Sequence, residues 1–126
     1  MVQMLGKWLD GFAISASLLC VIHCLALPLT IMALPLMTVA LGNSDWFHPV
    51  ILMFAIPTSL FALLSGFREH GQLRTLIFGL IGILCLFFGV WIEHLVIAET
   101  VLTVVGSLFL ASAHLHNIRL RSSTSI

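Results

Sequence analysis

Two cysteines and a histidine lie close together in an apolar stretch near the start of the chain, in the segment Cys20-Val21-Ile22-His23-Cys24. Residues three and four positions apart are neighbours on a helix, so these three side chains share one face. Ionisable groups are expensive inside a bilayer and mark functional sites there, and thiolate and imidazole are ligands of soft and borderline metal ions. We therefore expect Cys20, His23 and Cys24 to bind a metal ion. The alternative is that the cysteines only pack and that His23 only forms a hydrogen bond between helices.

Pro28 adds to this candidate site. Proline has no backbone N–H, so the carbonyl of Cys24 loses its usual helical partner, and the helix is expected to kink at this point. A freed carbonyl beside two sulfurs and an imidazole would complete a wall of metal ligands on one face of the helix.

The composition places these residues in a membrane protein. The chain has 126 residues, of which 60% are hydrophobic and 8% charged, with a mean hydropathy of +1.18. This predicts one integral membrane domain covering residues 1–126. The formal net charge of zero argues against nucleic acid as a partner. Three cysteines, all inside predicted spans, do not form the pattern of a secreted disulfide framework.

Four segments are apolar and long enough to cross a bilayer, which predicts an all-α fold, a four-helix transmembrane bundle. The expected spans are residues 11–41, 50–66, 75–94 and 99–118, followed by a loose polar tail at 119–126. The cationic residues fall only at the N-terminus, between the second and third spans, and at the C-terminus: Lys7, Arg68, Arg74, Arg119 and Arg121. This distribution predicts that both termini are cytoplasmic.

Further candidate ligands map to both sides of the membrane. On the predicted outer side, carboxylates and imidazoles would attract cations to an entrance, at Asp45, His48, Glu93, His94 and Glu99. On the inner side, His70 and His114 would line an exit. The alternative is that these are ordinary polar residues at membrane boundaries. Because His116 is two residues from His114, only one of the two is expected to point inward.

Two of the expected helices have faces suited to packing. Gly79, Gly82 and Gly89 form a glycine strip on the third span, which favours close contact between helices. On the fourth span a set of residues at spacings of three and four shares one face: Glu99, Thr103, Gly106, Leu110, Ala113 and Asn117. Cys85 lies in the middle of the third span, where it would either face the first-helix cluster or only pack.

Taken together, these residues resemble the MerC-domain family, named for small inner-membrane mercury-resistance proteins. The resemblance runs from about Asp10 to Arg119 and is carried by motifs along the whole domain: Asp10, Ser17, Cys20-x-x-His23-Cys24, Pro28, Pro35, Phe47-His48, Pro57, Gly66-x-x-x-His70, Gly79, Glu99 and Ala113-His114-x-x-Asn117-x-Arg119. It implies four transmembrane helices, a multi-pass location in the bacterial inner (cytoplasmic) membrane, and uptake of mercuric ion through the first-helix cysteine pair.

The chain departs from the mercury-resistance type in two ways. Its cysteines are separated by three residues, including His23, where that type has C-x-x-C, and no cysteine follows Cys85. A site rich in histidine and carboxylate with only two nearby thiols suits zinc as well as mercury. The first hypothesis is therefore inward transport of a thiophilic divalent metal ion, zinc or mercury, with no catalytic residues and no organic cofactor.

Two other classes of function remain open. One is a membrane metal sensor or chaperone that binds without transport. The other is a small diiron or haem oxidoreductase, which would need several ligands at equal depth, whereas the predicted spans place them on opposite sides. The expected partners are the metal ion and the lipid bilayer, with a possible homodimer through the glycine strip or the second helix.

Overall fold

The computed structural model describes the backbone of residues 1–33, 47–92 and 94–124. These residues form four helices and, within the described ranges, no strand: α1 (Val2–Ala33), α3 (Phe47–His70), α4 (Leu73–Trp91) and α5 (Val96–Thr124). Each helix contains a stretch long and apolar enough to cross a membrane. The prediction of an all-α, four-helix membrane fold is confirmed.

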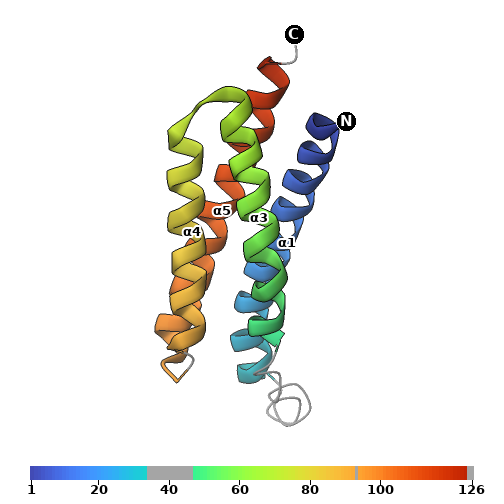
Figure 1. The fold of residues 1–126 in the computed structure, drawn as a ribbon. Coiled ribbons are helices and arrows are strands. Elements are labelled where there is room, and N and C mark those ends of the chain that lie inside the picture. The colour runs from blue at the N-terminus through green and yellow to red at the C-terminus, as the bar shows by residue number, and fades with distance from the viewer. Residues whose placement is uncertain (34–46, 93, 125–126) are drawn as a thin grey trace.

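The helices run alternately up and down, and both termini lie at the same end of the bundle (Figure 1). We call this the terminal end. It also holds the short connection at Gly71–Gln72 between α3 and α4, where Gly71 has a φ of +68° that favours glycine. The turn between α4 and α5 lies at the opposite end.

The helix bounds differ from the expected spans chiefly at the terminal end. Helix α1 already begins at Val2 rather than at residue 11, α3 continues to His70, and α5 continues to Thr124. The expectation of a loose tail at 119–126 is therefore wrong as far as Thr124. The physical reason is Arg121, which is fully buried in this last part of α5 and holds it against the bundle.

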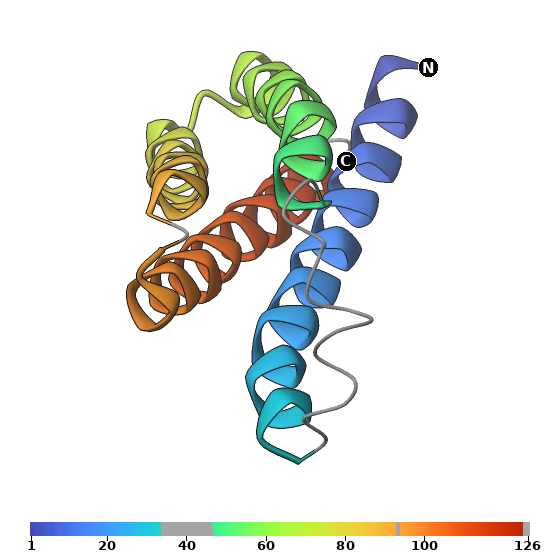
Figure 2. The same ribbon diagram turned by 90° about the horizontal axis from the view of Figure 1, so that it is seen from below.

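Helix α5 is the centre of the bundle. It contacts α1, α3 and α4, whereas α1 and α4 do not contact each other through any residue that the structure describes. Seen along the bundle, α5 passes between α4 on one side and α1 on the other (Figure 2). The two sides of α5 therefore have different partners.

The α4 side of α5 is packed through glycine. A Cβ atom added to Gly82 would lie 2.8 Å from the Gly106 carbonyl oxygen and 2.8 Å from the Leu110 backbone nitrogen, so the two helices approach as closely as their backbones allow. Beside this contact is a small apolar core: Leu63, Ile83, Leu86, Leu110 and Ala113. The expected close packing along the glycine strip is confirmed.

This packing bears on two further expectations. The strip is occupied within the chain, because Gly79 contacts Leu63, Gly82 contacts α5 and Gly89 contacts Thr103. The homodimer through this strip or through the second helix stays a prediction. A Cβ on Gly106 would lie 2.9 Å from the Cβ of Cys85, so Cys85 packs against α5.

The outer surfaces of the helices carry large apolar side chains in positions that would face lipid. Trp8, Phe54, Phe88, Trp91 and Ile97 are each more than half exposed. Because the outside of this bundle is apolar, the polar residues that are buried stand out.

Candidate functional site

The face that α1 turns toward the bundle is polar. Among the α1 side chains that the structure describes, the buried residues are Gly6, Asp10 and Ser17. A spacing of seven residues separates Asp10, Ser17 and Cys24, which places all three on one face of a helix. Asp10 and Ser17 therefore lie on the buried face of α1.

Helix α5 carries a matching row. Ser107, His114 and Arg121 are also seven residues apart, and all three are buried. The two rows meet at the terminal end, where the Asp10 carboxylate accepts a hydrogen bond of 2.6 Å from Nδ1 of His114. Both side chains have no exposed surface.

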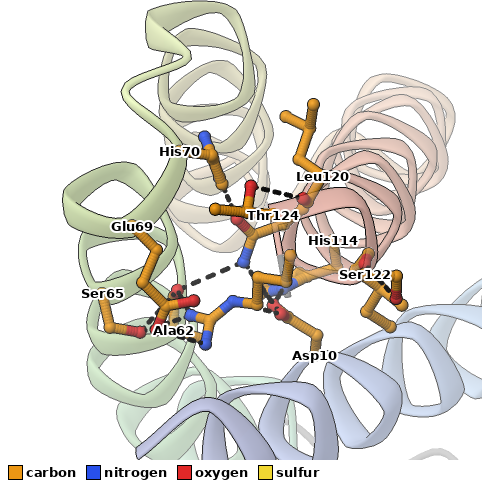
Figure 3. Close-up of polar contacts among 12 residues, drawn as sticks. Asp10, Ala62, Ser65, Glu69, His70, His114, Leu120, Ser122 and Thr124 are labelled. Carbon is orange, nitrogen blue, oxygen red and sulfur yellow. Dashed lines mark hydrogen bonds and ion pairs between the residues drawn. The ribbon is translucent and has the colours of Figure 1, made fainter. Parts of the chain in front are cut away.

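Arg121 joins three helices. Its Nη2 donates to the Ala62 carbonyl at 2.9 Å and to Ser65 Oγ at 2.5 Å, both on α3. Its Nη1 donates to Oε1 of Glu69 at 3.1 Å, and its Nε lies 3.5 Å from Oδ2 of Asp10. Figure 3 shows Asp10 of α1, Ser65 and Glu69 of α3 and His114 of α5 converging where these helices meet. We call this group, together with Arg121 and Asn117, the terminal cluster.

The backbone N–H of Gln72 fixes the direction of the hydrogen bonds around Asn117. Nδ1 of His70 accepts from the backbone N–H of Gln72 at 3.0 Å, so Nε2 of a neutral His70 carries the proton and donates to Oδ1 of Asn117 at 2.7 Å. The Asn117 amide then donates to Asp10 at 2.8 Å and 3.0 Å. Asp10 therefore accepts from both His114 and Asn117, which is the behaviour of an ionised carboxylate.

Two features of the terminal cluster would favour a bound cation: its charge and its polar atoms without partners. It contains two carboxylates, Asp10 and Glu69, against one guanidinium, so it has an excess of negative charge when His114 is neutral. In addition, Nε2 of His114 and Oγ of Ser107 are buried and have no hydrogen-bond partner in the described part of the chain. Because Nδ1 of His114 donates to Asp10, the neutral ring has its lone pair on Nε2, which is the form that binds metal ions.

The first-helix candidates lie within α1, which is helical from Cys20 through Cys24 and past Pro28 to Ala33. Cys20 is half-buried. The side chains of His23 and Cys24 lie outside the part of the structure that is described, so their joint ligand role stays a prediction. The same holds for the kink expected at Pro28.

The remaining candidates are divided between the two ends. His48 lies in the first turn of α3, His94 is exposed in the turn before α5, and Glu99 is half-buried in the first turn of α5. Asp45 and Glu93 lie outside the described residues. His70 and His114 lie at the terminal end, where Asn117 bonds to His70 and to Asp10, and Asp10 bonds to His114. Since Asn117 and the backbone N–H of Gln72 occupy both ring nitrogens of His70, this residue could bind a metal ion only by giving up a hydrogen bond.

Two expectations about α5 are confirmed. His114 is fully buried, while His116 is exposed and bonded to Thr75 Oγ1 at 3.1 Å through its Nδ1. The expected shared face is also buried, at Thr103, Gly106, Leu110, Ala113 and Asn117, with Glu99 half-buried.

In the described part of the chain no three His, Cys, Asp or Glu side chains gather closely enough to hold a metal ion. His70 is linked to His114 through Asn117 and Asp10, whereas His94 and Glu99 belong to the turn before α5 and to the first turn of α5, at the opposite end of the bundle from the two termini (Figure 1). Among these described residues, the candidate ligands are therefore spaced along the molecule and do not converge on one point.

The sequence reasoning missed several residues of the terminal cluster. Asp10 was noted only as part of a family pattern, Arg121 was placed in a loose tail, and Glu69 and Ser65 were not considered. A signal was present nonetheless, because Arg121 continues the seven-residue spacing of Ser107 and His114. That continuation predicts a helix that extends beyond residue 118.

Comparison with known proteins gives one match. The family model described as MerC mercury resistance protein matches residues 10–119. No curated protein and no solved structure matches the chain significantly.

Proposed function

The chain belongs to the MerC mercury resistance protein family, whose members are membrane transport proteins, and on that premise we propose that it moves mercuric ion across the inner membrane through Cys20, His23 and Cys24. The single observation that supports the proposal most is the occurrence of two thiols and an imidazole at helical spacing within α1 of a MerC-family chain. Mercuric ion is a soft cation that prefers thiolate, so a cysteine pair is the suitable binding group.

The membrane orientation that we propose follows from the positions of the charges. All five Lys and Arg residues belong to helix segments at the terminal end: Lys7, Arg68, Arg74, Arg119 and Arg121. Loops rich in Lys and Arg stay in the cytoplasm, so we propose that the terminal end faces inward. Acidic and imidazole groups at the opposite end, among them His94 and Glu99, would raise the local concentration of cations before entry.

The departure of this chain from the mercury-resistance type bears on the choice of metal. A pair of thiols with His23 between them also suits zinc, which accepts sulfur and nitrogen ligands together. We propose mercuric ion as the principal substrate because the family match supports it, and zinc as the competing substrate that the same experiment must include.

The test is metal uptake by proteoliposomes that contain the purified protein. The double variant Cys20→Ser/Cys24→Ser should lose uptake, because serine hydroxyls do not replace thiolates as ligands of a soft metal. Cys85→Ser is the matched control: it also removes a thiol from a spanning helix, but Cys85 packs against Gly106 of α5. It should keep the wild-type rate.

Three outcomes separate the hypotheses. Uptake in the wild type and in Cys85→Ser, with none in the double variant, supports transport through the cysteine pair. Stoichiometric binding without uptake by the wild type would favour a membrane sensor or chaperone. Undiminished uptake by the double variant would remove the cysteine pair from the mechanism. Parallel assays with mercuric ion and zinc identify the preferred metal.

A further inference from the structure

Two rows of buried polar residues lie between α1 and α5. One row is Asp10 and Ser17 on α1, and the other is Ser107, His114 and Arg121 on α5; we call the two rows together the polar seam. All five residues are buried, with relative exposures of 0%, 6%, 1%, 0% and 0% respectively. The opposite side of α5 is packed mainly with glycine and leucine against α4.

The register of the seam follows from the contacts at its terminal end. His114 bonds to Asp10, and Arg121 lies against Gly6. The two helices are antiparallel, so each step toward the C-terminus of α1 corresponds to a step toward the N-terminus of α5. One seven-residue step is about 10 Å along a helix. It brings Ser17 to the level of Ser107, and a second step brings Cys24 to the level of Thr100. The seam therefore runs from the terminal cluster to the level of Ser17 and Ser107, one seven-residue step from the level of Cys24.

Packing alone does not account for the residues of the seam. Oγ of Ser107 has no hydrogen-bond partner among the described residues, although it is buried in an apolar bundle. Nε2 of His114 is in the same position. Buried polar atoms without partners destabilise a protein, so each such group calls for an explanation such as a bound ligand.

The Asp10–His114 pair has the geometry of a prepared metal ligand. Histidines that bind metal ions usually donate their other ring N–H to a carboxylate, which fixes the orientation and tautomer of the ring. Here the 2.6 Å bond to Asp10 does this, and it leaves the Nε2 lone pair without a partner inside the seam.

We propose that the polar seam is the route of the metal ion between the cysteine pair and the terminal end, with Nε2 of His114 as a second binding station and Asp10 as its positioning residue. The inference rests on the proposed transport function and adds the path. Arg121 contributes to release, because its fixed positive charge lies 3.5 Å from the same carboxylate and opposes a second cation there. A station in a transport path must bind weakly enough to let the ion leave.

The decisive variant is His114→Asn. The amide nitrogen of asparagine takes the place of Nδ1, so it keeps the bond to Asp10 and removes only the Nε2 ligand. The initial rate of mercuric ion uptake by proteoliposomes should fall by at least about tenfold, the usual effect of disturbing a metal site. His116→Asn is the matched control, because His116 is an exposed histidine on the same helix and lies outside the seam; its uptake should equal that of the wild type.

A second measurement separates a lost path from a damaged protein. Mercuric ion bound to the cysteine pair gives a thiolate-to-metal absorption band, which should keep its full stoichiometry in His114→Asn while uptake falls. Ser107→Leu gives an independent test that leaves every hydrogen bond of the terminal cluster in place. Its larger side chain should obstruct the seam at mid-height and slow uptake to a similar extent.

The outcomes bear on the inference and on the proposed function separately. Slow uptake with intact thiolate binding in both variants supports the seam as the route. Wild-type uptake in either His114→Asn or Ser107→Leu overturns it, and so does loss of thiolate binding in the two variants together. The proposed function is decided by the Cys20→Ser/Cys24→Ser variant alone, so the seam can fail while transport through the cysteine pair stands.

Discussion

Arg121 should be the most important polar residue for the stability of the bundle. The substitution Arg121→Met keeps the length of the side chain and removes its charge. It also removes the hydrogen bonds to Ala62 and Ser65 and the ion pairs with Glu69 and Asp10. The buried carboxylate of Asp10 and the half-buried carboxylate of Glu69 would then have no permanent cation beside them. Breaking a buried ion pair by removing one partner costs about 3–5 kcal/mol, and we expect the free energy of unfolding to fall by that amount.

The substitution Asp10→Asn provides the comparison that makes this reasoning specific. After it, Arg121 and Glu69 still balance each other, and the asparagine oxygen still accepts from Nδ1 of His114. The new amide group, however, faces the amide of Asn117, which loses an acceptor. One unsatisfied buried polar group costs about 1–3 kcal/mol. The charge count therefore predicts that Arg121→Met is more costly than Asp10→Asn by about 2 kcal/mol.

The assay is reversible unfolding in mixed detergent micelles, followed by tryptophan fluorescence, since the chain has three tryptophans. Arg119→Met is the matched control, because Arg119 is exposed and lies two residues before Arg121 on the same helix. It should change the free energy of unfolding by less than about 0.5 kcal/mol. The reasoning is refuted if Arg121→Met stays within about 1 kcal/mol of the wild type, or if Asp10→Asn is the more costly of the two.

Three other predictions follow from the same contacts. Gly82→Leu should separate α4 from α5, because its Cβ would lie 2.8 Å from the Gly106 carbonyl oxygen. In the same unfolding assay it should destabilise the bundle by at least about 1–3 kcal/mol. The control is Gly11→Ala, whose Cβ meets nothing within 4 Å and which should be neutral or slightly stabilising. Thr75→Val removes the hydrogen bond to His116 and should cost about 1 kcal/mol, and an unchanged unfolding curve would show that this bond contributes nothing. Acidification should weaken the binding of mercuric ion to the cysteine pair, because thiols must lose protons to bind, and a titration that is independent of pH would contradict thiolate ligation.

The fold could be predicted because its main cause is recorded locally in the sequence. A bilayer requires helices of about 20 apolar residues, and runs of that length are visible without knowledge of their partners. The packing of α4 on α5 was also accessible, since Gly79, Gly82 and Gly89 fall on one helical face and glycine permits close approach. Both features depend on periodicity within a single helix.

Hydropathy alone could not predict the end of α5, although the seven-residue spacing of Ser107, His114 and Arg121 indicates a longer helix. A stretch with Arg119, Arg121 and several serines looks polar and loose when only hydropathy is considered. Its helical structure depends on a tertiary contact, because Arg121 finds its partners on α3 and α1, at Ala62, Ser65, Glu69 and Asp10. No local pattern states that a cation near the membrane boundary will be buried.

The candidate site was predicted in part for a related reason. The prediction that His114 lies inside and His116 outside needed only the helical period, and the structure confirms it. That Asp10 would be the carboxylate holding His114 depends on the pairing of α1 with α5 across a sequence separation of 104 residues. The sequence shows which residue types could form the site, whereas their pairing depends on how the helices pack in the fold.

The two sides of α5 suggest how one small bundle combines stable helix packing with a route for an ion. Toward α4, backbone contact at Gly82 and the apolar side chains around Leu110 make an interface with no space for an ion. Toward α1, Ser107 and His114 keep polar atoms that this packing does not satisfy. If stability were the only requirement on α5, alanine at these two positions would remove the unsatisfied atoms and leave the α4 interface unchanged. The unsatisfied polar atoms lie on the side of α5 that faces α1, and the stabilising apolar packing lies on the side that faces α4. The proposed path and the stabilising interface therefore occupy opposite faces of a single helix.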